Sequence, residues 1–296
     1  MSILPKNEKK QPVDTPSNFF IYGASMHGKS YLAGEFPNPL FLDTDGNSDA
    51  NPYPSIHLRN IRGEDGSIGQ NVVDQLDEIV TALQTTNHTY ETIVLDVIDD
   101  IVVMIEQYIC DRAGVEALTD MAYGKGYATF NSIFQQLVIE LKALPLNVIY
   151  VSRINSYDDN GVTVEEPSLK ERHVNIVNGN CDYRIQCKKV GKNYLRITKL
   201  KRKNYKREQI GDERIAKILE SVTGAFEKTR KTDKKKQDRL VKEMDERQEQ
   251  MALGEQNKDK SGANNTDQNN TNKNNNSTKT KPSASRVAPR VKPNVN

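Results

Sequence analysis

The segment that most constrains this chain runs from Gly23 to Ser30 and reads Gly-Ala-Ser-Met-His-Gly-Lys-Ser. It matches the pattern G-x-x-x-x-G-K-[ST], in which glycines let the backbone wrap around a phosphate group. The apolar run 18–22 precedes the segment, and the helical pattern 29–36 follows it and is closed by Pro37. The motif therefore lies where a strand leads into a helix, which is the context that its chemistry requires.

Every residue of this loop is a candidate for phosphate binding. The lysine is expected to reach the outer phosphates, and the final serine is expected to supply a hydroxyl to Mg²⁺. His27 is interpreted as a tolerated loop side chain, because such loops bind through backbone groups. The candidate residues are Gly23, Ala24, Ser25, Met26, His27, Gly28, Lys29 and Ser30.

The pattern on both sides of this loop predicts alternating strands and helices. Short apolar runs typical of buried strands recur at 39–43, 92–97 and 147–151. Apolar residues recur at helical spacing over 72–83, 98–110, 127–144 and 212–226, whereas the Gly-, Asn-, Asp- and Pro-rich residues 44–70 predict a long loop. This alternation predicts an α/β fold with a mainly parallel sheet and helices on both faces. Alternating segments at 183–187 and 194–198 add a C-terminal antiparallel hairpin.

Acidic residues follow the second and third predicted strands. Asp96 ends the run Thr-Ile-Val-Leu-Asp, where an acid typically binds Mg²⁺ together with the phosphate loop. The turn Asp43-Thr44-Asp45-Gly46 follows the second strand. Asp99 and Asp100 come just after Asp96, and we expect them to cap the next helix, since acids stabilise helix N-termini.

A phosphate loop, then a D-T-acid-G turn, then a strand ending in Asp resembles the RecA/KaiC-type ATPase core. The resemblance implies a RecA-like P-loop NTPase fold, with ATP and Mg²⁺ as cofactors and Lys29, Asp45 and Asp96 as catalytic residues. It assigns Asp45 to polarise the attacking water; many members have the longer Glu there, so we expect slow turnover. At the end of the next strand it implies that Ser152 senses the γ-phosphate, and Arg153 is a candidate contact for phosphate or a neighbouring subunit.

The overall plan over about residues 18 to 226 resembles the phage-type AAA-domain nucleotide-binding proteins, a compact RecA-core group counted among single-strand annealing proteins. This resemblance implies ATP-linked binding of single-stranded DNA, strand annealing in phage recombination or replication, and cooperation with a single-strand-binding protein. It also implies a homo-oligomer, either a ring or a filament, whose neighbouring subunits share nucleotide.

Residues 188–207 contain ten Lys or Arg and no acid, with Tyr194 and Tyr205 interleaved. Two interpretations compete. The segment binds nucleic-acid backbone, with the tyrosines available for base stacking, or one of its cations reaches the ATP of a neighbouring subunit. The candidate residues are Lys199, Lys201, Arg202 and Lys203.

The charge distribution divides the chain further. The last 40 residues hold eight Lys or Arg, two Asp or Glu and 11 Asn, whereas residues 1–256 have 34 basic and 38 acidic residues. We expect a flexible arm over 1–17, the ATPase core over 18–227, a charged helical extension over 228–256 and a disordered basic tail over 257–296. The absence of a long apolar run predicts no membrane partner, and the predicted location is the cytoplasm, that of the bacterial host if the chain is phage-encoded.

Other functions remain open at the level of sequence. A GTPase is disfavoured because the only Asn-Lys-Asp, at 257–259, lies in the predicted tail. A P-loop kinase would use residues 160–175, which include Lys170, Arg172 and His173, as a lid. An AAA+ loader would need a larger helical domain after the core. A scaffold that binds ATP and DNA with little hydrolysis is a further alternative.

Overall fold

The computed structural model describes residue 7 and residues 14–159, 161–229 and 231–247. The chain divides into two units, Met1–Thr229 and Arg230–Asn296, and each is described by itself. The predicted arm over 1–17 lies mostly outside the described residues, and the predicted tail over 257–296 lies wholly outside them.

The first unit is built on a seven-stranded sheet in the order β11-β10-β1-β7-β6-β2-β3. All neighbouring strands are parallel except β10 and β11, which form an antiparallel hairpin. The strands are β1 (Asn18–Tyr22), β2 (Pro39–Asp43), β3 (Ser55–His57), β6 (Thr92–Asp96), β7 (Asn147–Ser152), β10 (Tyr183–Val190) and β11 (Asn193–Lys201).

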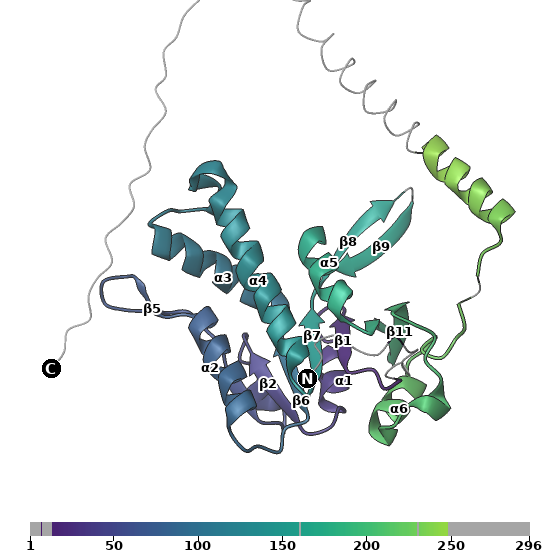
Figure 1. Cartoon of the computed structure of the whole chain (residues 1–296), viewed down its shortest axis with the longest axis horizontal. Coiled ribbons are helices and arrows are strands. Elements are labelled where there is room, and N and C mark those ends of the chain that lie inside the picture. The colour runs from purple at the N-terminus through teal and green to yellow at the C-terminus, as the bar shows by residue number, and fades with distance from the viewer. Residues whose placement is uncertain (1–6, 8–13, 160, 230, 248–296) are drawn as a thin grey trace, which may run out of the picture. The chain divides into compact units, whose positions relative to one another are not determined.

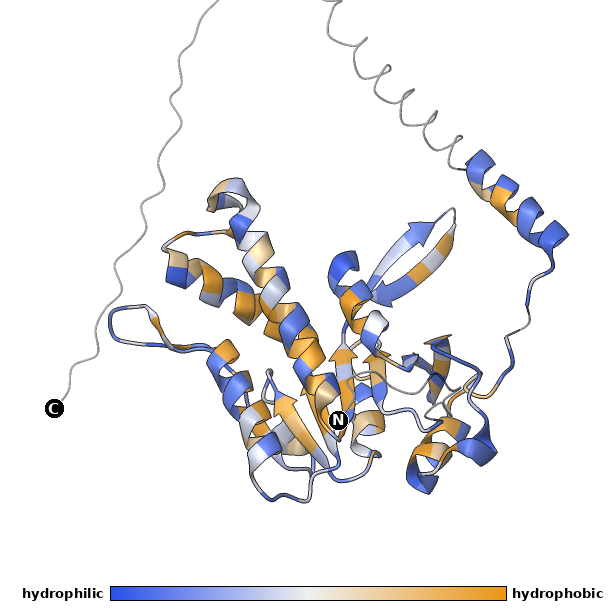
Figure 2. Cartoon of the chain, viewed as in Figure 1, coloured by the Kyte–Doolittle hydropathy of each residue, from blue (hydrophilic) through white to orange (hydrophobic). Residues whose placement is uncertain are grey.

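Helices cover both faces of this sheet (Figure 1). One face packs on α2 (Val72–Thr85), α3 (Ile98–Ala113), α4 (Lys125–Ala143) and α5 (Glu171–Asn180). The other packs on α1 (Lys29–Gly34) and α6 (Glu213–Glu220). Successive residues of a strand point to opposite faces, so Phe20 lies in the first core and Phe19 and Ile21 in the second. Strands buried on both faces must be continuously apolar, as the orange strands in Figure 2 show.

This arrangement confirms the predicted α/β class, a mainly parallel sheet with helices on both faces and a C-terminal antiparallel hairpin. Strand β7 lies between β1 and β6. The loop after β1 and the acid at the end of β6 therefore meet at the carboxyl edge of the sheet, one strand apart, which is where ligands bind in open α/β sheets.

Two sequence-based predictions of local structure were wrong in part. Residues 44–70 are not one loop, because β3 joins the sheet edge and β4 (Ile61–Arg62) pairs with β5 (Ile68–Gln70). Strands of two or three residues are too short to show an alternating pattern. The last helix ends at Glu220 rather than at 226, because Thr223 exchanges backbone hydrogen bonds with β11.

The sequence pattern predicted no strand directly after β7, where β8 (Ile154–Asp159) and β9 (Val162–Pro167) form an antiparallel hairpin. This hairpin is mostly polar, and the alternation of Val162 and Val164 is too short to predict a strand. Short 3₁₀ turns complete the unit: η1 (Asn47–Ala50), η2 (Leu118–Asp120), η3 (Ala122–Gly124) and η4 (Arg207–Gln209).

In the second unit, residues 234–247 are helical and all exposed. Ion pairs spaced four residues apart, Arg239 with Glu243 and Lys242 with Glu246, lie along its surface. Such pairs support an exposed helix. No helix within the described ranges is both long and apolar enough to cross a bilayer.

Candidate functional site

The loop between β1 and α1 has the backbone shape that its glycines allow. A Cβ on Gly23 would lie 2.3 Å from the carbonyl oxygen of Cys187 on β10, so only glycine fits there. Gly28 has φ 83° immediately before α1, a left-handed conformation that glycine adopts without steric cost. Met26 is 88% exposed, and its side chain therefore lies outside the loop.

Lys29 lies across this loop. Its side chain is buried, and Nζ donates a hydrogen bond to the carbonyl oxygen of Ala24 at 3.0 Å. Burial lowers the pKa of this ammonium, and the nearby Asp96 carboxylate opposes that change. A buried ammonium with one neutral partner has donors left for an anion, since lysine carries three.

Asp96 at the end of β6 faces the same point. Burial raises the pKa of its carboxyl group to about 6, and the Asp45 and Asp43 carboxylates add to the rise. A hydrogen bond from Ser30 and the charge of Lys29 act in the opposite direction. Ser30, Lys29, Asp45 and Asp96 are thus brought together from three strand ends.

This group of residues fits Mg²⁺ bound together with phosphate. Mg²⁺ is usually held by one or two carboxylates, waters and substrate phosphates rather than by a protein cage. Among the described residues, no cluster of three or more His, Cys, Asp or Glu forms such a cage. Asp96 and Ser30 would supply the protein ligands. Within the same described set, Nδ1 of His27 is buried without a hydrogen-bond partner, which leaves a further polar atom for a ligand.

The turn after β2 carries two acids in different environments, a buried Asp43 and an exposed Asp45. Asp43 is 2% exposed and accepts hydrogen bonds from Ser48 Oγ at 2.7 Å, with His57 Nδ1 3.1 Å away. Thr44 Oγ1 accepts from the backbone N–H of Val97 at 3.1 Å, which ties this turn to the end of β6. Asp45 is exposed, so of the two acids it is the one that water can reach.

Ser152 ends β7 and Arg153 directly follows it, as expected, and both side chains have polar partners. Ser152 is fully buried and donates its hydroxyl to Asp99 at 3.1 Å. Arg153 forms a two-pronged ion pair with Asp100, at 2.6 and 2.9 Å. Both side chains therefore contact acids of α3 in this structure, and Asp100 raises the pKa of Arg153.

Asp99 and Asp100 lie in the first turn of α3 as predicted, but neither makes a capping hydrogen bond there. The N-cap residue is Val97, and no side chain makes a capping hydrogen bond there. Asp99 instead accepts hydrogen bonds from Ser152, the Arg153 backbone and Ser168 Oγ. The partners of these two carboxylates are distant in the sequence, so the local pattern could not predict them.

Residues 15–211, well over half of the chain, match the family described as an AAA domain. The chain belongs to this AAA domain family. Among solved structures, one titled "Crystal structure of the RadB recombinase" is similar at 12% identity and a TM-score of 0.37, over 64% of this chain and 83% of that chain. A search of curated proteins finds no match.

The basic segment of this AAA domain is largely tied to its own core. Lys201 Nζ donates to the carbonyl oxygens of 224, 225 and 227, Arg202 binds the carbonyl oxygens of Gly179 and Cys181, and Lys203 pairs with Asp14 at 2.7 Å. Of the four predicted residues, Lys199 alone is exposed without an ion pair among the described residues.

The interpretation of Tyr205 as a stacking residue was wrong. Its ring is 5% exposed, lies 5.1 Å from the ring of Tyr183, and its hydroxyl donates to Asp182 at 2.7 Å. Tyr194 is 57% exposed. A tyrosine within a basic segment gives no sequence signal that distinguishes the two environments.

Two of the three residues named for a phosphate lid, His173 and Lys170, have other partners in this structure. His173 is buried against the rings of Phe130 and Phe134, and Lys170 pairs with Glu106 at 3.2 Å. Sequence reasoning missed Glu165 on β9, which binds Lys188 Nζ and Gln186 Nε2, each at 2.7 Å. These contacts fix the β8–β9 hairpin beside β10.

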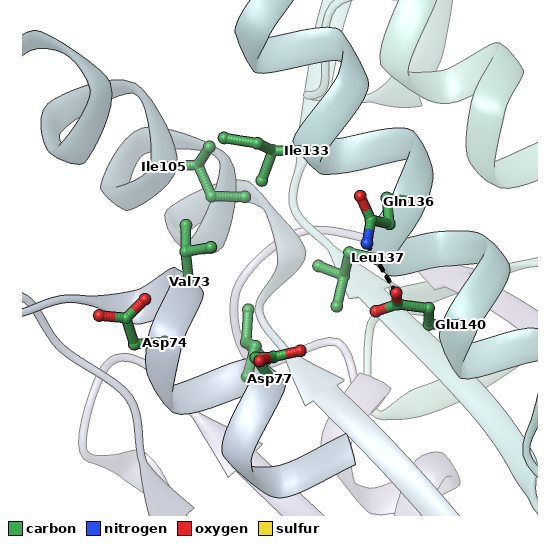
Figure 3. Close-up of a pocket in the computed structure, with 9 residues that line it drawn as sticks. Val73, Asp74, Asp77, Ile105, Ile133, Gln136, Leu137 and Glu140 are labelled. Atoms are coloured by element: carbon green, nitrogen blue, oxygen red, sulfur yellow. Dashed lines mark hydrogen bonds between the residues drawn. The ribbon is translucent and has the colours of Figure 1, made fainter. Parts of the chain in front are cut away.

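A separate cavity of about 260 Å³ lies between α2, α3 and α4 (Figure 3). Val73, Ile105, Ile133 and Leu137 give it an apolar wall, and Asp74, Asp77 and Glu140 stand around it. None of its lining residues belongs to the phosphate loop or to the strand ends around it. It is therefore a different feature from the candidate nucleotide site.

Proposed function

We propose that this protein binds ATP with Mg²⁺, hydrolyses it slowly, and binds single-stranded DNA as an oligomer in DNA recombination or replication, with strand annealing as its task. The observation that carries the proposal is the convergence of Lys29, Ser30 and Asp96 at the carboxyl edge of the sheet. These three side chains supply the cation, the hydroxyl and the carboxylate that a Mg²⁺–triphosphate complex needs.

Bound Mg²⁺ would neutralise charge on the phosphates. The loop backbone and Lys29 would orient the outer phosphates. Asp45 would accept a hydrogen bond from an attacking water. Asp45 is one carbon shorter than Glu, which favours slow turnover. Arg153 is a candidate for phosphate contact in cis or in a neighbouring subunit, and using it requires its pair with Asp100 to open.

The DNA part of the proposal rests on exposed cations of the basic segment. Lys192 and Lys199 are exposed and make no ion pair among the described residues. Free lysines attract phosphate backbone without sequence preference. The tethered residues Lys201, Arg202 and Lys203 position this surface rather than bind DNA through their charges.

The test is ATP hydrolysis by the full-length protein with and without single-stranded DNA, beside Lys29→Ala. We expect a DNA-stimulated rate that Lys29→Ala lowers by about a hundredfold or more, since it removes charge stabilisation at the outer phosphates. The matched control is Lys217→Ala, an exposed lysine of α6, which should keep the wild-type rate.

Three other results would change the proposal. A rate that DNA does not affect would reject the coupling to DNA and favour another P-loop enzyme. Binding of ATP and DNA without hydrolysis would favour the scaffold alternative. Equal rates for Lys29→Ala and wild type would show that hydrolysis does not occur at this loop.

A further inference from the structure

The β10–β11 hairpin extends beyond the end of β1. Strand β1 pairs with β10 as far as Tyr22 opposite Gln186. The hairpin continues for four more cross-strand pairs, including Lys189 opposite Tyr194. Because the phosphate loop begins directly after Tyr22, this extension stands beside the loop.

Tyr194 contacts the loop at its most constrained residue. A Cβ placed on Gly28 would lie 3.4 Å from Cδ1 of the Tyr194 ring and 3.9 Å from its Cε1. The ring is nevertheless 57% exposed. Lys189 Nζ lies 5.1 Å from the ring centroid, a cation–π contact that comes from the same hairpin.

A second contact fixes β11 against α1. Arg196, two residues beyond Tyr194, binds both oxygens of Glu35 at 2.5 and 2.7 Å and Ser221 Oγ at 2.7 Å. Glu35 is the C-cap residue of α1, whereas Gly28 is its N-cap residue. Strand β11 is therefore anchored at the C-terminal end of α1 through Arg196, and it carries the Tyr194 ring to the N-terminal end of the same helix.

The order of the strands gives the direction of a bound nucleotide. Asp96 and Ser30 mark the metal and the outer phosphates on the β6 side of β1. Strand β10 lies on the opposite side of β1. The far end of a nucleotide held by the loop, its ribose and base, therefore extends toward the β10–β11 hairpin and Tyr194.

We propose that Tyr194 is the stacking platform for the base of the bound nucleotide and that it selects purine over pyrimidine nucleotides. This inference rests on the proposed nucleotide function of the loop. Stacking on an aromatic ring uses the π-face that every base has, and the larger purine ring system covers more of it. The platform therefore favours ATP and GTP over CTP.

The experiment compares Mg²⁺ complexes of ATP, CTP and inorganic tripolyphosphate by calorimetric titration of the full-length chain. Tyr194→Ala should weaken ATP binding about tenfold, the effect of losing one aromatic stack, weaken CTP less, and leave tripolyphosphate unchanged. Tyr194→Phe should retain wild-type affinity, because the ring remains. Tyr127→Ala on α4, another exposed tyrosine, is the matched control.

Other outcomes would each contradict a specific part of the proposal for Tyr194. Equal weakening of ATP and tripolyphosphate would mean that Tyr194 supports the phosphate loop rather than the base. Weaker binding of single-stranded DNA with unchanged ATP affinity would assign the ring to DNA. If the wild type binds ATP no more tightly than tripolyphosphate, the base platform is wrong but the phosphate site stands. If the wild type binds neither ligand, the proposed nucleotide function is wrong.

Discussion

Asp96 shows how a single buried carboxylate can lower the stability of the folded protein at neutral pH. Its pKa is raised from 3.8 to about 6, mainly by burial. A carboxyl group whose pKa is higher in the folded state binds more protons there than in the unfolded state. The protein without bound nucleotide therefore gains stability as the pH falls from about 7 toward 4. At pH 7 the ionised group is destabilising unless a cation is bound.

Replacing Asp96 by Asn should therefore stabilise the nucleotide-free protein at pH 7, by at most about 3 kcal/mol for a rise of about two pKa units. Urea denaturation of both proteins at pH 7 and at pH 4.5 measures this. The difference should shrink at pH 4.5, where Asp96 in the folded protein is already neutral. A variant less stable than wild type at pH 7 would contradict the prediction.

The local sequence predicted the position of residues that belong to a continuous motif or end a strand. Gly23 to Ser30 form a continuous motif, and Asp96 ends a strand, so their placement at one edge followed from the strand order alone. Arg153 and Asp100 are 53 residues apart, and Tyr205 and Asp182 are 23 apart. No periodicity encodes such pairs, because they depend on which loops meet after the sheet has formed.

At the scale of elements, the central strands were predictable, whereas the short edge strand β3 and the β8–β9 hairpin were not. Strands buried on both faces must be apolar on both, and this rule identifies β1, β2, β6 and β7 as apolar runs in the sequence. The β8–β9 hairpin is polar along most of its length, and Glu165 and Glu166 on β9 tie it to Lys188 and Arg184 on β10.

The close contact of β10 with the phosphate loop leads to a prediction about packing between elements. Gly23→Ala would place a Cβ 2.3 Å from the backbone oxygen of Cys187, so β10 would have to move away from β1. We expect a loss of about 1–3 kcal/mol in the free energy of unfolding, measured as a lower urea midpoint with an unchanged m-value.

Gly179→Ala in α5 is the matched control, because nothing outside its own stretch of helix lies within 4 Å of the added Cβ. Alanine in a helix should raise stability by about 0.5–1 kcal/mol. A Gly23→Ala protein as stable as wild type would show that β10 is not held against the loop as described.

For the whole molecule, the small net charge of +2 conceals a separation of charge. Residues 1–256 have more acidic than basic groups, so a polyanion is attracted to the protein only where cations gather, in 188–207 and in the last 40 residues. Binding of single-stranded DNA should therefore weaken steeply with salt, with a slope that counts the lysines in contact with phosphate.

The double variant Lys192→Ala/Lys199→Ala should lower the slope of log Kobs against log salt by about 1.4, since each contact with a single strand contributes about 0.7. Both ammonium groups are exposed and without ion pairs among the described residues, so their loss should leave the fold intact. Fluorescence anisotropy of a labelled oligonucleotide across a salt series measures the slope, with Lys217→Ala as control. An unchanged slope in the double variant would place the DNA contacts elsewhere, and the basic C-terminal residues would become the next to test.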